Sequence, residues 1–264
     1  MRDLPLWARD NTWVLPFLKS EKRVAIAHKL GGDNMWLLEA NKKVIDILID
    51  AWVTQTFSVS AFRSSVRDFN TTSKLIKAWE SQDQETILRI LSEIQAFHSE
   101  LLEDILQASP ETLRNELIDY SQKLFENYKT QSLESDLQKC HSLNDYQLWV
   151  GEKIFSLLSI GEVIAAKVFV RYLQASWIDA IYVDIDTMKD INPTELSLKS
   201  EDFLSQTFQK IFAKNPQAIP IIPGYIGGIE GWILKKLGRG YTDFTGSRSA
   251  VALHDMKHFD QVIL

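Results

Sequence analysis

The stretch VAIAHKLGG, residues 24–32, decides the expected fold because an apolar run leads directly into two adjacent glycines. Such a run is typical of a strand buried on both faces, and Gly31-Gly32 is typical of the tight turn that follows it. After the turn, apolar residues recur at helical spacing from Leu37 to Ile49, and a second strand is expected over residues 56–60. This order is a βαβ unit, which predicts an α/β fold with a parallel sheet.

The remaining chain continues the alternation of helices and strands. Residues 71–172 are charged and poor in glycine, with apolar residues three and four apart, which predicts a helical bundle beside the sheet. Further elements are expected, in chain order, as a strand over 178–185, a helix near 201–213, a strand over 218–223, a helix over about 246–254 and the start of a strand at 261–264.

Composition excludes several classes of protein. The 264 residues are 45% apolar and 24% charged, as in an ordinary globular domain, and no run is apolar enough to cross a membrane. A net charge of −6 argues against nonspecific binding of nucleic acid. A single cysteine, Cys140, and the absence of a secretion signal favour a reducing, cytoplasmic location. His254 and His258 lack a third ligand nearby, so no metal site is predicted.

The glycines gather in two places. Of eleven, two are Gly31 and Gly32, and seven fall within the 23 residues from Gly224 to Gly246. Glycine is needed where a backbone turns sharply or where another group approaches it closely. The two clusters are therefore either hairpin turns or two backbone cradles of one split site.

Charged residues accompany both clusters. Lys29 beside the first could neutralise a phosphate held by backbone N–H groups. Arg239 and Asp243 in the second suit a carboxylate and an amine or metal, although a structural ion pair between them is an alternative. Glu162 is expected in the first turn of a helix, where it either favours the helix dipole or receives an ammonium group.

Taken in order, these motifs resemble those of the aspartokinases, which belong to the amino acid kinase family. The resemblance covers roughly residues 24–264, and the part over residues 238–251 looks most like the ectoine-pathway subgroup. The matching segments are Lys29-Leu30-Gly31-Gly32, Val59-Ser60-Ala61, Thr71-Thr72-Ser73, Ile160-Gly161-Glu162, Val183-Asp184, Gly224-Tyr225-Ile226-Gly227 and the complete Gly238-Arg239-Gly240-Tyr241-Thr242-Asp243.

The resemblance implies a three-layer αβα sandwich around a mainly parallel sheet, with a helical insert over about 71–172. It implies a catalytic domain over residues 23–264 after an extension over 1–22, and a chain that stops before the C-terminal part of the nucleotide lobe. The implied enzyme transfers the γ-phosphoryl group of ATP to the side-chain carboxylate of L-aspartate, with Mg²⁺. Dimerisation of two identical chains, through a sheet edge or a helix, is a further family expectation.

The resemblance also assigns roles to individual residues. Lys29 and Asp243 would be catalytic, with Asp243 orienting Lys29. Glu162 would bind the substrate ammonium and Arg239 its α-carboxylate. The phosphate cradle would be Gly31, Gly32, Gly238 and Gly240, and the rest of the aspartate pocket would be Ser60, Thr72, Tyr225 and Thr242.

The sequence departs from the family pattern at Asp33-Asn34, which replaces Thr-Ser. An acid near phosphate oxygens would repel ATP by about 1–4 kcal/mol at 4 Å, depending on screening. Two alternatives therefore stay open beside the aspartate kinase. One is a catalytically silent domain that binds aspartate or a partner subunit, and the other is a kinase of another amino acid carboxylate.

Overall fold

Five parallel strands form the centre of the structure. The computed structural model describes residues 24–30, 54–59, 74, 77–78, 81, 83–107, 109–133, 143–185, 196–224, 241–257 and 259–264. The strand order is β3-β4-β2-β1-β5, and every neighbouring pair is parallel. The strands are β1 (Val24–Leu30), β2 (Thr54–Val59), β3 (Ala180–Tyr182), β4 (Ile219–Pro223) and β5 (Gln261–Ile263).

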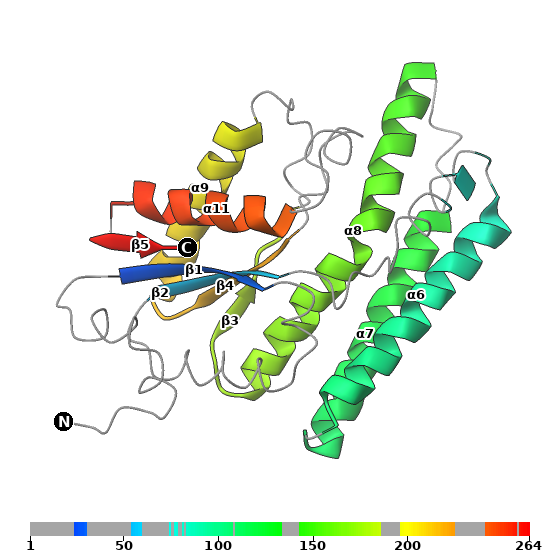
Figure 1. Cartoon of the computed structure of the whole chain (residues 1–264), viewed down its shortest axis with the longest axis horizontal. Helices are drawn as coiled ribbons and strands as arrows, with labels where there is room; N and C mark the ends of the chain where they lie inside the picture. The colour runs from blue at the N-terminus through cyan, green and yellow to red at the C-terminus, as the bar shows by residue number, and fades with distance from the viewer. Residues whose placement is uncertain are drawn as a thin grey trace.

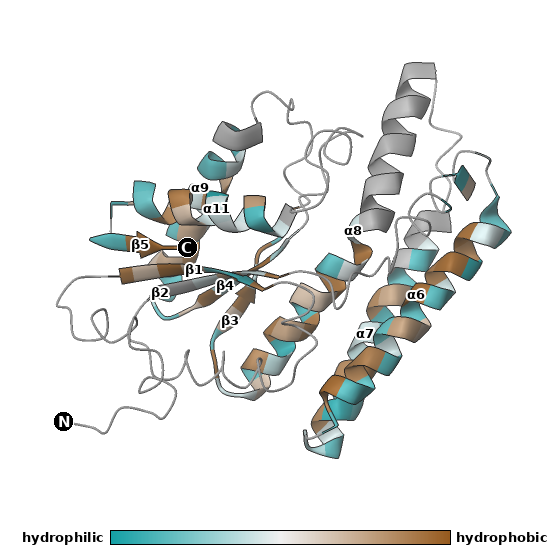
Figure 2. Ribbon diagram, in the orientation of Figure 1, coloured by the Kyte–Doolittle hydropathy of each residue, from teal (hydrophilic) through white to brown (hydrophobic). Residues whose placement is uncertain are grey.

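The sheet is covered on both faces, which explains why β1 and β4 read as nearly continuous apolar runs. All five residues of β4 are buried. Its consecutive residues point to opposite faces, so Ile221 joins one hydrophobic cluster and Ile222 the other. Figure 2 shows brown, hydrophobic segments in β1, β3, β4 and β5, whereas β2 is paler.

Two helices cover the first face. They are α9 (Leu196–Lys214) and α11 (Tyr241–Asp255), which pack against each other, while α11 also contacts β1, β2 and β5 (Figure 1). Leu204 and Phe208 of α9 and Leu253 of α11 are buried in the same cluster as Ala27 of β1. The small alanine side chains of β1 allow these helices to approach the sheet closely.

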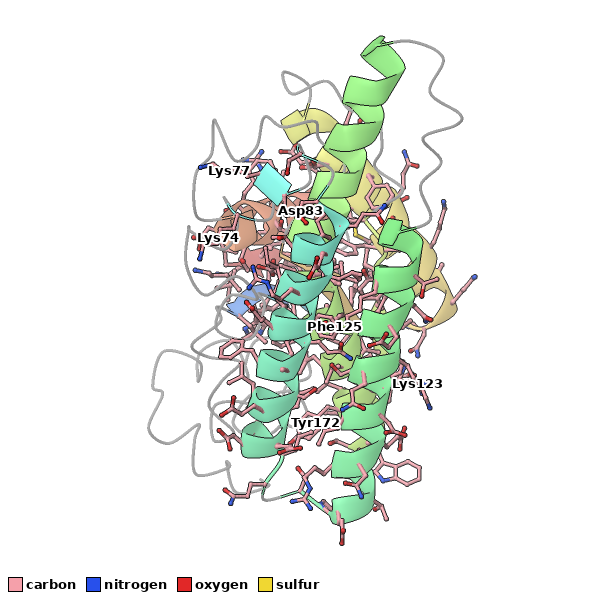
Figure 3. All side chains as sticks on the ribbon, turned by 90° about the vertical axis from the view of Figure 1, so that its right-hand side faces the viewer. Lys74, Lys77, Asp83, Lys123, Phe125 and Tyr172 are labelled. Atoms are coloured by element: carbon pink, nitrogen blue, oxygen red, sulfur yellow. The ribbon has the colours of Figure 1, made fainter. Side chains whose placement is uncertain are left out.

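A long helix, α8 (Leu143–Ala175), covers the second face, where it contacts β2, β3 and β4. Two further helices, α6 (Gln84–Ile105) and α7 (Glu111–Leu133), lie outside it: α7 packs against α8, and α6 packs against α7 (Figure 1). Figure 3 views them from outside: Lys123 points outward from α7, whereas Phe125 lies between the helices and is fully buried. Layers of helix, sheet and helix result.

The expected fold class, a three-layer αβα sandwich around a mainly parallel sheet, is confirmed. The strand at 24–30 has the predicted bounds, and β1 and β2 are parallel neighbours as the βαβ unit requires. The helix predicted between them, over 37–49, lies outside the described residues. The final strand, β5, pairs with β1. Across the described helices, none has the length and apolar character that a membrane span needs.

One local expectation is wrong. Gly161-Glu162 does not open a helix, because α8 begins at Leu143 and continues through both residues. Gly161 is buried, so the close packing of α8 against its neighbours outweighs the poor helix propensity of glycine. Glu162 therefore lies in the interior of the helix, where the favourable interaction with a helix N-terminus does not apply.

Candidate active site

The carboxyl ends of β1, β2 and β4 meet at one edge of the sheet because the three strands are parallel. Gly224 follows β4 directly, and its N–H donates a hydrogen bond to the carbonyl oxygen of Val59, the last residue of β2, at 2.7 Å. In open α/β sheets, ligands bind outside this carboxyl edge. This edge is therefore the expected position of a functional site.

Buried hydroxyl groups hold the start of α11 at the same edge. The Ser58 hydroxyl donates to the carbonyl oxygen of Thr242 at 3.3 Å, which joins β2 to α11. The Thr245 hydroxyl donates to the carbonyl oxygen of Gly224 at 2.6 Å, which joins α11 to the end of β4. Both hydroxyl-bearing residues are buried, so the first turn of α11 has a fixed position above the strand ends.

Three elements converge on Gly224. A Cβ atom at this position would lie 2.6 Å from the Thr242 hydroxyl oxygen and 3.0 Å from both Oε2 of Glu162 and the carbonyl oxygen of Val59. Glycine is therefore required here by close approach rather than by backbone conformation. As a consequence, a hydroxyl group from α11 and a carboxylate from α8 lie against the same point of the backbone.

A charged pair completes the described part of the site. Nζ of Lys29, near the end of β1, lies 2.8 Å from Oδ1 of Asp243, in the first turn of α11. Their side chains are 41% and 63% exposed. Exposed ion pairs contribute little to stability. Because both side chains are exposed, both charged groups are accessible to a ligand at the edge of the sheet.

Four of the residues singled out by the sequence lie in this arrangement. Lys29 contacts Asp243 directly, and Glu162 and Thr242 both approach Gly224. The ion pair of Asp243 is with Lys29; the alternative partner, Arg239, lies outside the described residues. Also outside them are Gly31, Gly32, Ser60, Thr72, Tyr225, Gly238 and Gly240.

Three positioning residues were not singled out by sequence reasoning: Ser58, Gly224 as a packing point, and Thr245. The sequence does give an indication for Ser58, because it is a small polar residue in a strand of the buried sheet. Thr245 lies three residues beyond Thr242, the spacing that places two residues on one face of a helix. Neither signal could have been assigned a partner without the tertiary structure.

No group of three or more metal-ligating side chains occurs within the part of the chain that the structure describes. His254 is 77% exposed and lies 3.4 Å from its neighbour Asp255. His258 lies outside the described residues.

Comparisons with known proteins point in one direction. No protein-family model matches the chain. It is 23% identical over 249 residues to an aspartokinase of Candida albicans, a match that covers 86% of this chain and 42% of that protein. It is 27% identical over 101 residues to an aspartokinase of Schizosaccharomyces pombe, covering 37% of this chain and 19% of that protein. The chain thus spans less than half the length of these curated relatives.

A solved structure agrees on the fold. The crystal structure of Escherichia coli aspartokinase III in complex with lysine and aspartate superposes with a TM-score of 0.51 at 18% identity. The superposition covers 89% of this chain and 48% of that one. None of these matches distinguishes the ectoine-pathway subgroup. The chain is therefore similar to the aspartokinases in sequence, and it has their α/β fold.

Proposed function

We propose that residues 23–264 form the catalytic region of an aspartate kinase, which transfers the γ-phosphoryl group of ATP to the side-chain carboxylate of L-aspartate. The product is 4-phospho-L-aspartate. The observation that carries this proposal is the gathering of Lys29, Asp243, Glu162 and Thr242 at the carboxyl edge of a parallel sheet. The similarity to aspartokinases supports the choice of substrate.

Phosphoryl transfer needs positioning and charge neutralisation more than covalent chemistry. The ammonium group of Lys29 neutralises the negative charge on the transferring phosphoryl group. Asp243, 2.8 Å away, holds that ammonium group in place. The acceptor is already a carboxylate, so the enzyme needs no serine or cysteine nucleophile. The backbone N–H groups of the four glycines Gly31, Gly32, Gly238 and Gly240 surround the phosphates.

The amino acid pocket lies around Gly224. Glu162 receives the substrate ammonium group, since its side chain reaches the carboxyl edge of the sheet, where its Oε2 atom lies against this glycine. Arg239 forms a bidentate pair with the α-carboxylate. Ser60, Thr72, Tyr225 and Thr242 complete the pocket with hydroxyl groups. Opposite charges on Glu162 and Arg239 favour a free amino acid over an N-acylated one.

The described residues fit a nucleotide at this edge. Lys29 offers a partly exposed cation, and Asp243 offers an exposed carboxylate beside it. ATP supplies the phosphoryl group that is transferred. In kinases Mg²⁺ is held mainly by substrate phosphates and water, with only one or two carboxylates from the protein. Asp243 is the described residue best placed to provide one of them.

The experiment that tests the proposal is ATP-dependent formation of aspartyl hydroxamate by the purified chain in the presence of hydroxylamine and Mg²⁺. We expect turnover with L-aspartate, and a loss of about 100-fold or more in Lys29→Met. Lys210→Met, which removes an exposed lysine from α9, is the matched control and should keep its activity.

Parallel reactions with glutamate and N-acetylglutamate test the choice of substrate. Faster turnover of either compound than of L-aspartate would assign a different amino acid carboxylate. If the folded chain binds L-aspartate without any turnover, the kinase proposal is wrong and a silent binding domain takes its place.

A further inference from the structure

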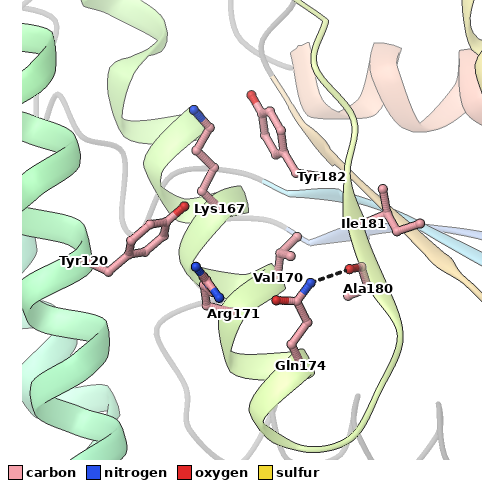
Figure 4. A pocket seen from close by; sticks show the side chains of 8 residues that line it. All are labelled: Tyr120, Lys167, Val170, Arg171, Gln174, Ala180, Ile181 and Tyr182. Carbon is pink, nitrogen blue, oxygen red and sulfur yellow. Dashed lines mark hydrogen bonds between the residues drawn. The ribbon is translucent and has the colours of Figure 1, made fainter.

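A cavity lies on the side of α8 that faces away from the candidate active site. It has a volume of about 370 Å³ and lies between α7, α8 and the edge strand β3 (Figure 4). Arg171, in its wall, is nine residues after Glu162 on the same helix. At 100° and 1.5 Å per residue, this places the two residues about 180° apart around the axis and about 13 Å apart along it. The cavity is therefore separate from the aspartate pocket.

Two cations from adjacent turns of α8 line the cavity. Nζ of Lys167 lies 5.1 Å from the centre of the Tyr182 ring, and Cζ of Arg171 lies 5.3 Å from the centre of the Tyr120 ring. The two tyrosines thus hold the cations from opposite walls, β3 and α7. Within the described ranges, neither cation forms an ion pair with a carboxylate. The cavity consequently carries two positive charges that no described acid neutralises.

The frame around these charges is built from ordered contacts. Nε2 of Gln174 donates to the carbonyl oxygen of Ala180 at 2.9 Å, which ties α8 to β3 at the base of the cavity (Figure 4). Val170 and Ala180 are buried beneath it. Figure 4 also shows the Tyr120 hydroxyl directed toward α8. A volume of this size is in the range of small-molecule sites, whose few polar groups fix the orientation of the ligand.

We propose that this cavity binds a small organic dianion, either a dicarboxylate or a phosphomonoester. Side chains four residues apart on a helix are neighbours, so Lys167 and Arg171 can each engage one end of such a ligand. The guanidinium group of Arg171 matches the two oxygens of a carboxylate or phosphate, and the Lys167 ammonium supplies a compact charge. Aromatic rings behind both cations keep them oriented when no ligand is bound.

Binding to the full chain tests this assignment. The probes are succinate and glycerol phosphate, titrated calorimetrically at constant ionic strength without L-aspartate, because L-aspartate is itself a dicarboxylate and would compete for the cavity. The double variant Lys167→Gln/Arg171→Gln is compared with Arg89→Gln/Lys123→Gln. This control removes the same two residue types from exposed positions on α6 and α7.

We expect at least one probe to bind, and its affinity to fall about tenfold or more in the Lys167/Arg171 variant but not in the control. The stronger probe identifies the ligand as a dicarboxylate or a phosphomonoester. Arg171→Lys keeps the charge but removes the bidentate fork, and it should bind with intermediate affinity. Equal affinities in all variants, or no binding of either probe by the folded wild-type chain, would overturn the proposal. Because the readout is binding and not catalysis, it is independent of kinase activity.

Discussion

The substitution Gly224→Ala is expected to damage the site through a steric clash. The added methyl group would lie 2.6 Å from the Thr242 hydroxyl oxygen, where ordinary contact begins at 3.4 Å, and 3.0 Å from the carbonyl oxygen of Val59. Oε2 of Glu162, also 3.0 Å away, is the end of a flexible side chain but is itself buried. The backbone of the central strand β2 cannot move without disturbing its pairing with β1 and β4. Overpacking of this kind costs about 1–3 kcal/mol.

Gly246→Ala is the matched control for this prediction. Its methyl group would meet Leu264 at 3.5 Å, Lys29 at 3.6 Å and Ser58 at 4.0 Å, all ordinary contacts. Gly246 lies inside α11, where alanine is favoured over glycine by about 0.5–1 kcal/mol. The two substitutions add the same atoms but should shift stability in opposite directions.

Urea unfolding of both variants, followed by circular dichroism, measures these shifts. The free energy of unfolding should fall in Gly224→Ala and rise in Gly246→Ala. Calorimetric titration with L-aspartate should show weakened binding in Gly224→Ala alone, because its clash is with two side chains of the proposed pocket. A Gly224→Ala variant that is as stable as the wild type, and binds L-aspartate equally well, would refute the argument from close packing.

Two further predictions concern the outer helices. Burial lowers the pKa of His98 to about 4 from its ordinary 6.5, so below pH 6.5 the unfolded chain takes up a proton that the folded chain does not. The free energy of unfolding should therefore fall by about 2 kcal/mol between pH 7.5 and pH 5, and His98→Leu should remove this slope in urea unfolding; an unchanged slope would contradict it. Oδ1 of Asp83 accepts from the Thr86 N–H at 3.0 Å as the N-cap of α6. Asp83→Ala should lower the thermal midpoint and Asp83→Ser should largely retain it, whereas equal midpoints would deny the cap a role.

The strands and their order along the chain could be predicted because strands that are buried on both faces are rich in apolar residues. The run at residues 24–30 is apolar and ends at two glycines, and it forms β1 with the expected bounds. Helix ends were harder to predict. The last helix begins at Tyr241 rather than near residue 246, because the hydrogen bonds of Ser58 and Thr245 hold its first turn against the strand ends.

The site could be predicted in part. Motif order singled out Lys29 and Asp243, and the structure places them in contact. The surroundings of Glu162 could not be predicted, because Gly161 suggested a helix start while the packing of α8 kept the helix continuous. The approach of Glu162 and Thr242 to Gly224 joins segments far apart in sequence. Such distances depend on how layers pack, which no local pattern encodes.

The central claim is that Glu162 receives the ammonium group of an amino acid at the carboxyl edge of the sheet. The most direct measurement is the affinity of L-aspartate relative to succinate, which differs only in lacking that ammonium group, in the wild type and in Glu162→Gln. Titrations in the Lys167→Gln/Arg171→Gln background keep succinate from the cavity between α7, α8 and β3. The account predicts that the wild-type preference for L-aspartate falls about tenfold or more in Glu162→Gln, since a charge-assisted hydrogen bond is lost. An equal preference in both proteins would contradict the claim.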